Sequence, residues 1–248
     1  MKHFGNIKTL LTAGVAVAAL STFSSLQAQD MQQGKGVVRK ITGSAQYQTG
    51  GGVWMPISKG TELPPGSSIK TDKESIVDVY LGALNGPTLR VTGETTVAID
   101  TLTYTGTGED AVSETKLNLQ DGRILGSVRK LGQASKYEIK TPTGVAGIRG
   151  TDYDISTKKN AAGNYESIYI AVNGTIVGAD TFGGSTTSFV ANGTTANPQF
   201  FQSGQPGPVN GYPPGMQPFE QFNPGPPPPG GGALILPNPI VQTISTHL

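Results

Sequence analysis

Residues 137 to 155 read Tyr137-Glu138-Ile139-Lys140-Thr141-Pro142-Thr143-Gly144-Val145-Ala146-Gly147-Ile148-Arg149-Gly150-Thr151-Asp152-Tyr153-Asp154-Ile155. Apolar and polar residues alternate at both ends of this stretch, at Tyr137 and Ile139 and again at Tyr153 and Ile155. Such alternation puts the apolar side chains on one face of a strand. We therefore predict two strands, joined by a Thr141-Pro142 corner and a crossing of small residues in which glycine allows close backbone approach.

The same period of two recurs from Gly36 to Ala196, with segments rich in glycine and asparagine between the runs. Glycine and asparagine tolerate the positive φ that tight turns demand. The alternating positions include Val77, Val79 and Leu81; Leu89 and Val91; Val97 and Ile99; Leu117 and Leu119; and Ile168, Ile170 and Val172. We predict an all-β domain over residues 36–196, a compact antiparallel-rich sandwich or β-roll.

Residues 197–248 differ in composition from the predicted domain. They hold 13 of the 18 prolines and a single charged residue, Glu220. Proline lacks the backbone donor that a central strand needs, so we predict a largely disordered Pro/Gly-rich tail. Two apolar segments interrupt it, at 233–236 and around 240–244. Docking as a last strand and disorder are both compatible with them, and we favour disorder.

The N-terminus has the anatomy of an export signal. Lys2 and Lys8 precede an apolar run of about 14 residues, which is shorter than the roughly 20 of a spanning helix, and a polar stretch ends at Ala28. We predict a signal peptide over residues 1–28 and a short linker over 29–35. The mature protein is then exported, periplasmic or secreted to the cell surface, with no stable membrane span. The alternative is an uncleaved anchor.

Composition excludes several functional classes. Cysteine is absent, and the two histidines, His3 and His247, lie near the ends of the chain. The predicted domain therefore lacks thiolate chemistry and the usual proton shuttle near neutral pH. The 18 basic residues are balanced by 17 acidic ones, so no basic field for nucleic acid exists. We expect no cofactor, no metal site and no enzymatic activity.

A pair of carboxylates acting on a glycan is the enzyme class least excluded, because it needs neither histidine nor cysteine. The candidate acids are Asp72, Glu74, Asp78, Asp100, Asp121, Asp152 and Asp154. Asp152 and Asp154 are expected on the strand face opposite Tyr153 and Ile155. We interpret them as solvated acids on an outer face.

The 137–155 stretch resembles the FecR domain family, whose signature is Thr-Pro, small residues, and then Arg-Gly-Thr with an aromatic two positions on. The matching residues are Thr141, Pro142, Gly147, Arg149, Gly150, Thr151 and Tyr153. Further landmarks fit in order, among them Lys59–Thr71 and the closing pair at Val172–Val177. The resemblance covers about residues 36 to 180.

The resemblance implies an extracytoplasmic β domain. In the best-known members of the family such a domain contacts an outer-membrane receptor, while a cytoplasmic portion controls a sigma factor. Few residues precede the apolar run here, so we do not expect that portion. We expect a non-catalytic module that binds an envelope protein or polysaccharide, with a link to signalling. The alternative is a structural or adhesive surface or matrix protein.

Overall fold

The computed structural model describes residues 31–82, 86–105, 112–129 and 132–216. Its strands are β1 (Gln32–Gln33), β2 (Gly36–Thr42), β3 (Ala45–Thr49), β4 (Met55–Pro56), β5 (Glu62–Leu63), β6 (Ser67–Thr71), β7 (Ile76–Leu81), β8 (Thr88–Val91), β9 (Thr96–Thr105), β10 (Val112–Ser127), β11 (Lys136–Lys140), β12 (Gly144–Lys159), β13 (Tyr165–Phe182), β14 (Ser185–Gly193), β15 (Gln199–Gln202) and β16 (Val209–Asn210). The described residues form no helix, and hence none that could cross a membrane. The all-β prediction is confirmed.

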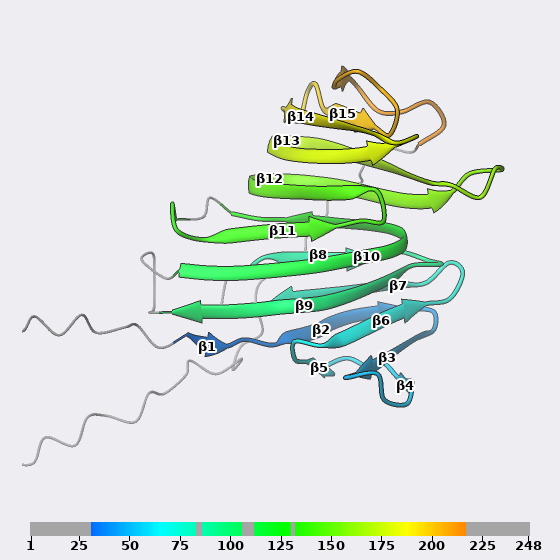
Figure 1. The fold of residues 1–248 in the computed structure, drawn as a ribbon. Helices are drawn as coiled ribbons and strands as arrows, with labels where there is room; N and C mark the ends of the chain where they lie inside the picture. The colour runs from blue at the N-terminus through cyan, green and yellow to red at the C-terminus, as the bar shows by residue number, and fades with distance from the viewer. Residues whose placement is uncertain (1–30, 83–85, 106–111, 130–131, 217–248) are drawn as a thin grey trace, which may run out of the picture.

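The strands form two facing layers, which Figure 1 shows as a stack of rungs. In the front layer the order of neighbours is β4, β3, β6, β9, first half of β10, β11, first half of β12, second half of β13, β14. In the back layer the order is β5, β2, β7, β8, second half of β10, second half of β12, first half of β13, β15, β16. The long strands β10, β12 and β13 therefore belong to both layers.

The pairing of β10 with β11 is parallel, and every other strand pairing among the described residues is antiparallel. After the second half of β10, the chain passes round the roll and re-enters the front layer beside its own first half. That path makes one complete turn of a coil, which is why these two strands run in the same direction. Before β11, the chain folds from one layer to the other at one long side of the roll. After β11 it folds over at the other long side. The register shows this, because the corner residue Asp152 pairs with Ser127, at the end of β10 away from the corner glycine Gly122.

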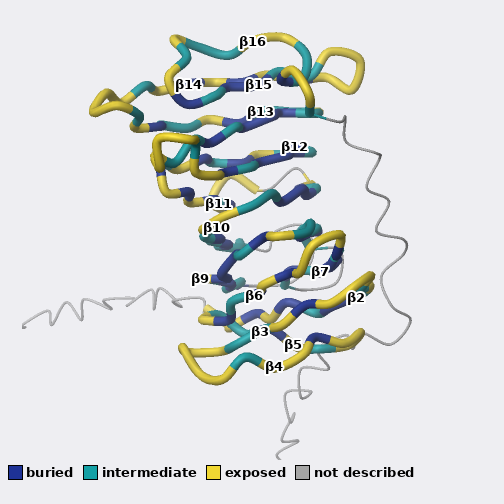
Figure 2. Tube along the Cα trace, turned by 90° about the vertical axis from the view of Figure 1, so that its right-hand side faces the viewer, coloured by how far each residue is buried: buried dark blue, intermediate teal, exposed yellow. Residues whose placement is uncertain are grey.

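The core lies between the two layers and is continuous along the stack (Figure 2). Inward residues of the front layer, such as Leu117 and Ile139, face those of the back layer, such as Ile124 and Ile155, and all four are fully buried. Burial of this alternating set is the main driving force for the fold. It also confirms most of the strand faces expected from the period of two. The exception is β13, where Tyr169 and Ala171 belong to the core, so that Ile168, Ile170 and Val172 lie on the opposite face from the one expected.

The structure corrects the predicted crossing of small residues. Gly144 to Ile148 form the first half of β12 and pair with both β11 and β13. A crossing does occur, but over Arg149–Asp152, where the register shifts and Gly150 has a φ of 59°. The small residues suit a central strand here because a Cβ on Gly144 would lie 2.0 Å from the Ala179 carbonyl oxygen.

The β structure also continues past the predicted boundary at residue 197. Strand β15 pairs with β13, and Phe200 and Phe201 are buried. The rings of Phe189 and Phe201 stack with their centroids 4.1 Å apart. Burial of these aromatic rings stabilises strand structure here, despite the proline and glycine content on which we based the predicted tail. The rest of the predicted tail, 217–248, and the predicted signal peptide lie outside the described residues.

Candidate functional site

Each place where the chain folds from one layer to the other needs a sharp corner, and Thr95 supports one of them. Its hydroxyl accepts the N–H of Arg123 at 3.0 Å and lies 3.1 Å from the carbonyl oxygen of Gly93, two residues back. Glu94 just before it has a φ of 54°, and Gly122 across from it has a φ of 95°. A Cβ on Gly122 would lie 2.5 Å from the Thr95 Cα. Only glycine fits there.

Thr151 supports a second corner with the same geometry. Its hydroxyl accepts the N–H of Thr175 at 3.0 Å and lies 3.1 Å from the carbonyl oxygen of Arg149, again two residues back. Gly150 before it has a φ of 59°, and Gly174 across from it has a φ of 110°. A Cβ on Gly174 would lie 2.3 Å from the Gly150 carbonyl oxygen.

Ser75 repeats the arrangement at a third corner. It accepts the N–H of Ser44 at 2.9 Å, Glu74 before it has a φ of 59°, and Gly43 across from it has a φ of 76°. Three corners therefore use one device: a residue with positive φ, a following serine or threonine, and a facing glycine. Gly150 and Thr151, two residues of the predicted family motif, are explained by this backbone role.

The side chain of the third motif residue, Arg149, takes no part in the corner. Its side chain is exposed, so the partners that a buried guanidinium would require are not needed. It lines a cleft of about 500 Å³ formed by residues 127–129, 149–152 and 173–175. Arg129, also exposed, and Asp152, half-buried, line the same cleft. The ion pairs formed within the described chain include neither arginine.

The arrangement of the cleft favours an anionic group. Two guanidinium groups and one carboxylate line it. The other polar side chains of the lining are the hydroxyl groups of Ser127, Thr151 and Thr175 and the amide of Asn173. Guanidinium groups bind carboxylates through two parallel hydrogen bonds. No group of three or more His, Cys, Asp or Glu side chains that could hold a metal occurs among residues the structure describes.

Arg123 is committed to the structure. Its Nε and Nη2 atoms lie 2.8 Å and 2.5 Å from the two carboxylate oxygens of Asp154. The hydrogen bond that Arg123 donates to Asp154 raises the pKa of Arg123. Burial raises the pKa of Asp154 despite the opposing effect of Arg123. The prediction of a solvated acid is therefore wrong for Asp154, because a guanidinium from the neighbouring strand covers it.

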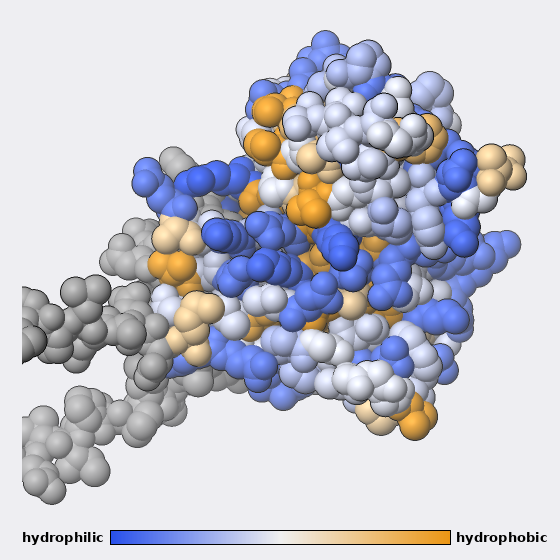
Figure 3. Space-filling model, viewed as in Figure 1, coloured by the Kyte–Doolittle hydropathy of each residue, from blue (hydrophilic) through white to orange (hydrophobic). Residues whose placement is uncertain are grey.

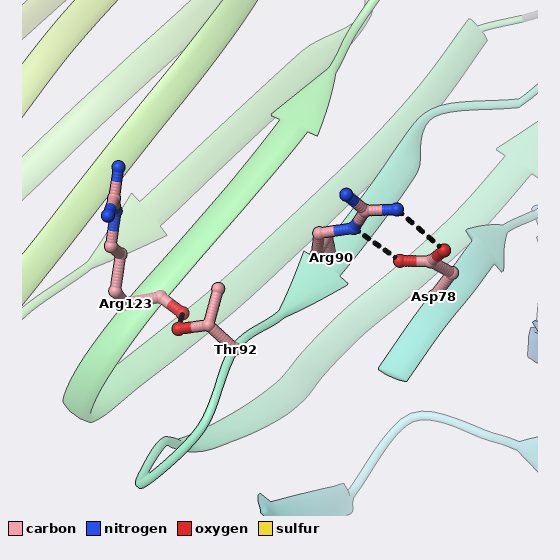
Figure 4. Close-up of polar contacts among 4 residues, drawn as sticks. All are labelled: Asp78, Arg90, Thr92 and Arg123. Carbon is pink, nitrogen blue, oxygen red and sulfur yellow. Dashed lines mark hydrogen bonds and ion pairs between the residues drawn. The ribbon is translucent and has the colours of Figure 1, made fainter. Parts of the chain in front are cut away.

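Asp78 is bound in the same way by Arg90, with two contacts of 2.7 Å and 2.9 Å (Figure 4). The figure also shows Thr92 donating to the backbone carbonyl of Arg123, at 2.9 Å. Two of the candidate acids thus cross-link adjacent strands of the back layer. Asp152 is the candidate acid that the structure brings to the cleft.

Thr141 and Pro142 lie at the opposite side of the roll from the cleft, in the turn between β11 and β12. The Thr141 hydroxyl lies 2.7 Å from the Tyr169 hydroxyl and accepts the N–H of Gly144 at 3.1 Å. Burial raises the pKa of Tyr169 to about 12. This turn is held by a buried hydroxyl network, so Thr141 is a structural residue.

Tyr153 points into the core, fully buried, and its hydroxyl lies 2.8 Å from that of Tyr137. Burial raises the pKa of both phenols well above the usual range. Gly126 gives the ring room, since a Cβ there would lie 2.4 Å from its Cζ. Gly147 lies in β12 opposite Val177. The structure thus brings only Arg149, Gly150 and Thr151 of the predicted set to the cleft.

Sequence reasoning did not single out the other side of the cleft, which Arg129, Asn173 and Gly174 supply. The signal available was the equivalence of Gly93-Glu94-Thr95 and Arg149-Gly150-Thr151, each followed along the chain by a glycine that closes the corner. Recognising it would have placed Gly174 opposite Thr151. The position of Arg129 depends on the turn of the coil between β10 and β11.

The family model described as FecR protein matches residues 67–165, which contain the Arg149-Gly150-Thr151 motif and the corners at Ser75 and Thr95. Residues 67–165 therefore match a FecR domain. This confirms the resemblance within those residues; the wider range of 36–180 stays a prediction. The comparisons with curated proteins and with solved structures give no match. A FecR domain suggests a signalling-related regulatory or sensor role.

Proposed function

We propose that this protein is an exported, non-catalytic FecR-type module that binds a carboxylate-bearing envelope protein or polysaccharide through the Arg149 cleft. The observation that supports the proposal is the position of Arg149. Of the three consecutive motif residues, two are used by the backbone corner, and the third extends an exposed guanidinium beside a cleft. A side chain that the fold does not use is the one available to a partner.

The charge arrangement of the two arginine types supports the same proposal. Arg90 and Arg123 are neutralised by buried acids on the back layer. Arg149 and Arg129 line an open cleft together with one carboxylate, that of Asp152. Such a surface attracts an anionic partner and gains from direct hydrogen bonds once water is displaced.

Export is the second part of the proposal, and it rests on the leader-like sequence of residues 1–28. Sequencing the N-terminus of the mature protein from cell fractions tests it. Cleavage after Ala28 gives a chain that begins at Gln29. An intact Met1 in the envelope fraction would replace the exported module with an anchored one.

The binding test compares Arg149→Gln with wild-type protein in a sedimentation assay on washed envelopes from the producing cells. We expect the variant to bind about tenfold more weakly, the loss that follows from removing about 1.4 kcal/mol of charge-assisted hydrogen bonding. Its thermal unfolding should be unchanged, since the side chain is exposed. A soluble polyglutamate competitor should release the wild-type protein.

Lys59→Gln is the matched control, because it removes one exposed positive charge at the far end of the stack. Equal binding by both variants would contradict the proposed cleft. Retention that survives Arg149→Gln, polyglutamate and high salt would instead identify the protein as a structural or adhesive component of the surface.

A further inference from the structure

We propose that residues 240–248 of this chain bind as an added strand along the free edge of β14 at the C-terminal end of the roll. The inference does not depend on the Arg149 cleft. It rests on three features of the described residues: an open edge, an incomplete rung, and the point at which the described chain stops.

The edge of β14 is long and uncharged. The strand has nine residues, Ser185–Gly193, and pairs along its whole length with β13 only. The N–H of Asn192 points away from β13, as its hydrogen bond to the Gln199 side chain at 2.8 Å shows. By the alternation of an antiparallel strand, Thr186, Ser188 and Val190 direct their N–H and C=O groups to the same unpaired side.

The opposite end of the roll is closed in a way that β14 is not. There the outermost strands, β4 and β5, have two residues each, and β4 contains Pro56. Short strands and proline are the usual means of keeping a sheet edge from pairing. A nine-residue edge with neither charge nor proline is a template for a further strand.

The last rung of the roll is half complete. Strands β14 and β15 form one rung across the two layers, and β16 lies beyond β15 in the back layer, as Figure 2 shows. Within the described residues no strand of the front layer lies opposite β16. The place left beside β14 is therefore the front half of a rung whose back half exists.

The same chain has both the position and the length to fill that place. Its described part ends at Met216, six residues after β16. The 23 residues from 217 to 239 have a maximum reach of roughly 75 Å, while facing layers lie about 10 Å apart. The connection can therefore pass from the back layer to the front one without strain.

The segment has the composition of a strand. Residues 240–248 read Ile240-Val241-Gln242-Thr243-Ile244-Ser245-Thr246-His247-Leu248, nine residues with no proline and no Asp, Glu, Lys or Arg. Ile, Val and Thr, which favour strands, make up most of it. Ile240, Ile244 and Leu248 fall on one face when the segment is extended, and that face can cover the end of the core at Phe189 and Phe201.

The outer surface beside the edge supplies the other contact. Val145, Val177 and Val190 are 44%, 54% and 49% exposed, and Val177 lies opposite Val190 in the register. Figure 3 shows hydrophobic surface over this upper part of the front face. Val241 on the second face of an added strand would extend this apolar row and remove it from water.

Hydrogen exchange on the full-length protein tests the proposal. We expect the amides of Thr186, Ser188 and Val190 to exchange at least about tenfold faster in Thr243→Pro than in the wild type, because proline at the centre of the added strand disrupts pairing. Gln221→Pro, which lies in the same tail but outside 240–248, should leave them protected. The Ile176 amide within β13 serves as the internal reference for folding.

The outcomes separate the possible occupants of the edge. Equal exchange of the three amides in all three proteins overturns the proposal. Protection that falls on dilution, together with a dimer in sedimentation, overturns it in favour of a second copy of this chain. Protection independent of concentration and lost only in Thr243→Pro supports the segment of the same chain.

Discussion

The corners supported by Thr95 and Thr151 have the same backbone, and each holds an arginine at a different position. Arg123 follows the facing glycine of the first corner, whereas Arg149 precedes the residue with positive φ in the second. In each, a threonine hydroxyl accepts an N–H across the corner at 3.0 Å and faces a glycine with positive φ. Arg123 is paired with a buried aspartate, whereas Arg149 is exposed beside a cleft. The comparison separates what a corner needs from what the molecule presents to others: glycine and threonine make the bend, and neither arginine side chain takes part in it.

The largest expected effect comes from the glycines, and it should be alike at the two corners. A Cβ at Gly122 or Gly174 would lie 2.3 Å to 2.9 Å from backbone atoms and threonine hydroxyl oxygens. The φ at both positions also disfavours any residue other than glycine. We expect each alanine substitution to lower the free energy of unfolding by about 4 kcal/mol. Urea denaturation measures the loss.

Gly147→Ala is the control for those substitutions. Its Cβ would have its nearest contact, with the Val177 carbonyl oxygen, at 3.5 Å, and its φ is not positive. We expect a change below about 1 kcal/mol. If Gly174→Ala lowered the free energy of unfolding as little as Gly147→Ala, the two corners would not share one backbone conformation.

Alkaline pH should destabilise the part of the fold after β10 more than the part before it. The three tyrosines with raised pKa values, Tyr137, Tyr153 and Tyr169, all follow β10. A raised folded-state pKa stabilises the protein below the unfolded value of 10, and that stability is lost as pH rises through the folded pKa. Between pH 9 and 11 we expect the free energy of unfolding to fall by about 1 kcal/mol for each tyrosine.

Urea denaturation at a series of pH values measures this loss, and absorbance at 295 nm reports phenol ionisation. The three buried phenols should ionise only as the protein unfolds. The double variant Tyr137→Phe, Tyr153→Phe should show a shallower dependence on pH. Ionisation of all tyrosines near pH 10 in the folded state would contradict the prediction.

The most direct test replaces each arginine with glutamine, and the smallest effect is expected at Arg149. Arg123→Gln leaves the Asp154 carboxylate buried without its cation, which should lower the free energy of unfolding by about 2–3 kcal/mol. Arg149→Gln should change it by less than about 0.5 kcal/mol, because its guanidinium is exposed. The difference in urea midpoints measures the contrast. Equal losses would mean that Arg149, like Arg123, has a structural role.

The strands were predictable and the corners were not. Alternation at Val77, Val79 and Leu81, or at Tyr153 and Ile155, reports which face is buried, because the period of a strand is local. A glycine such as Gly122 or Gly174 predicts a bend, but a hairpin and a fold-over between layers require the same positive φ. Only the pairing of the flanking segments distinguishes them, and that pairing is a long-range property.

The candidate site was predictable in part for the same reason. The motif at Arg149 could be found because its residues are consecutive. The partner of Asp154 is Arg123, 31 residues earlier, and no local pattern joins them. Burial of Phe200 and Phe201 likewise depends on β13 and β14, which offer an aromatic surface that the proline content of the region does not reveal.

The order of the rungs has a mechanical consequence. Each strand pairs mainly with its immediate neighbours in the stack, so a pull applied along the stack loads one rung at a time. We expect such an assembly to separate one rung after another, because each unit of a quasi-one-dimensional structure contacts only its neighbours. The parallel turn from β10 to β11 interrupts that sequence, because the chain there encircles the core and must unwind before the next rung can separate.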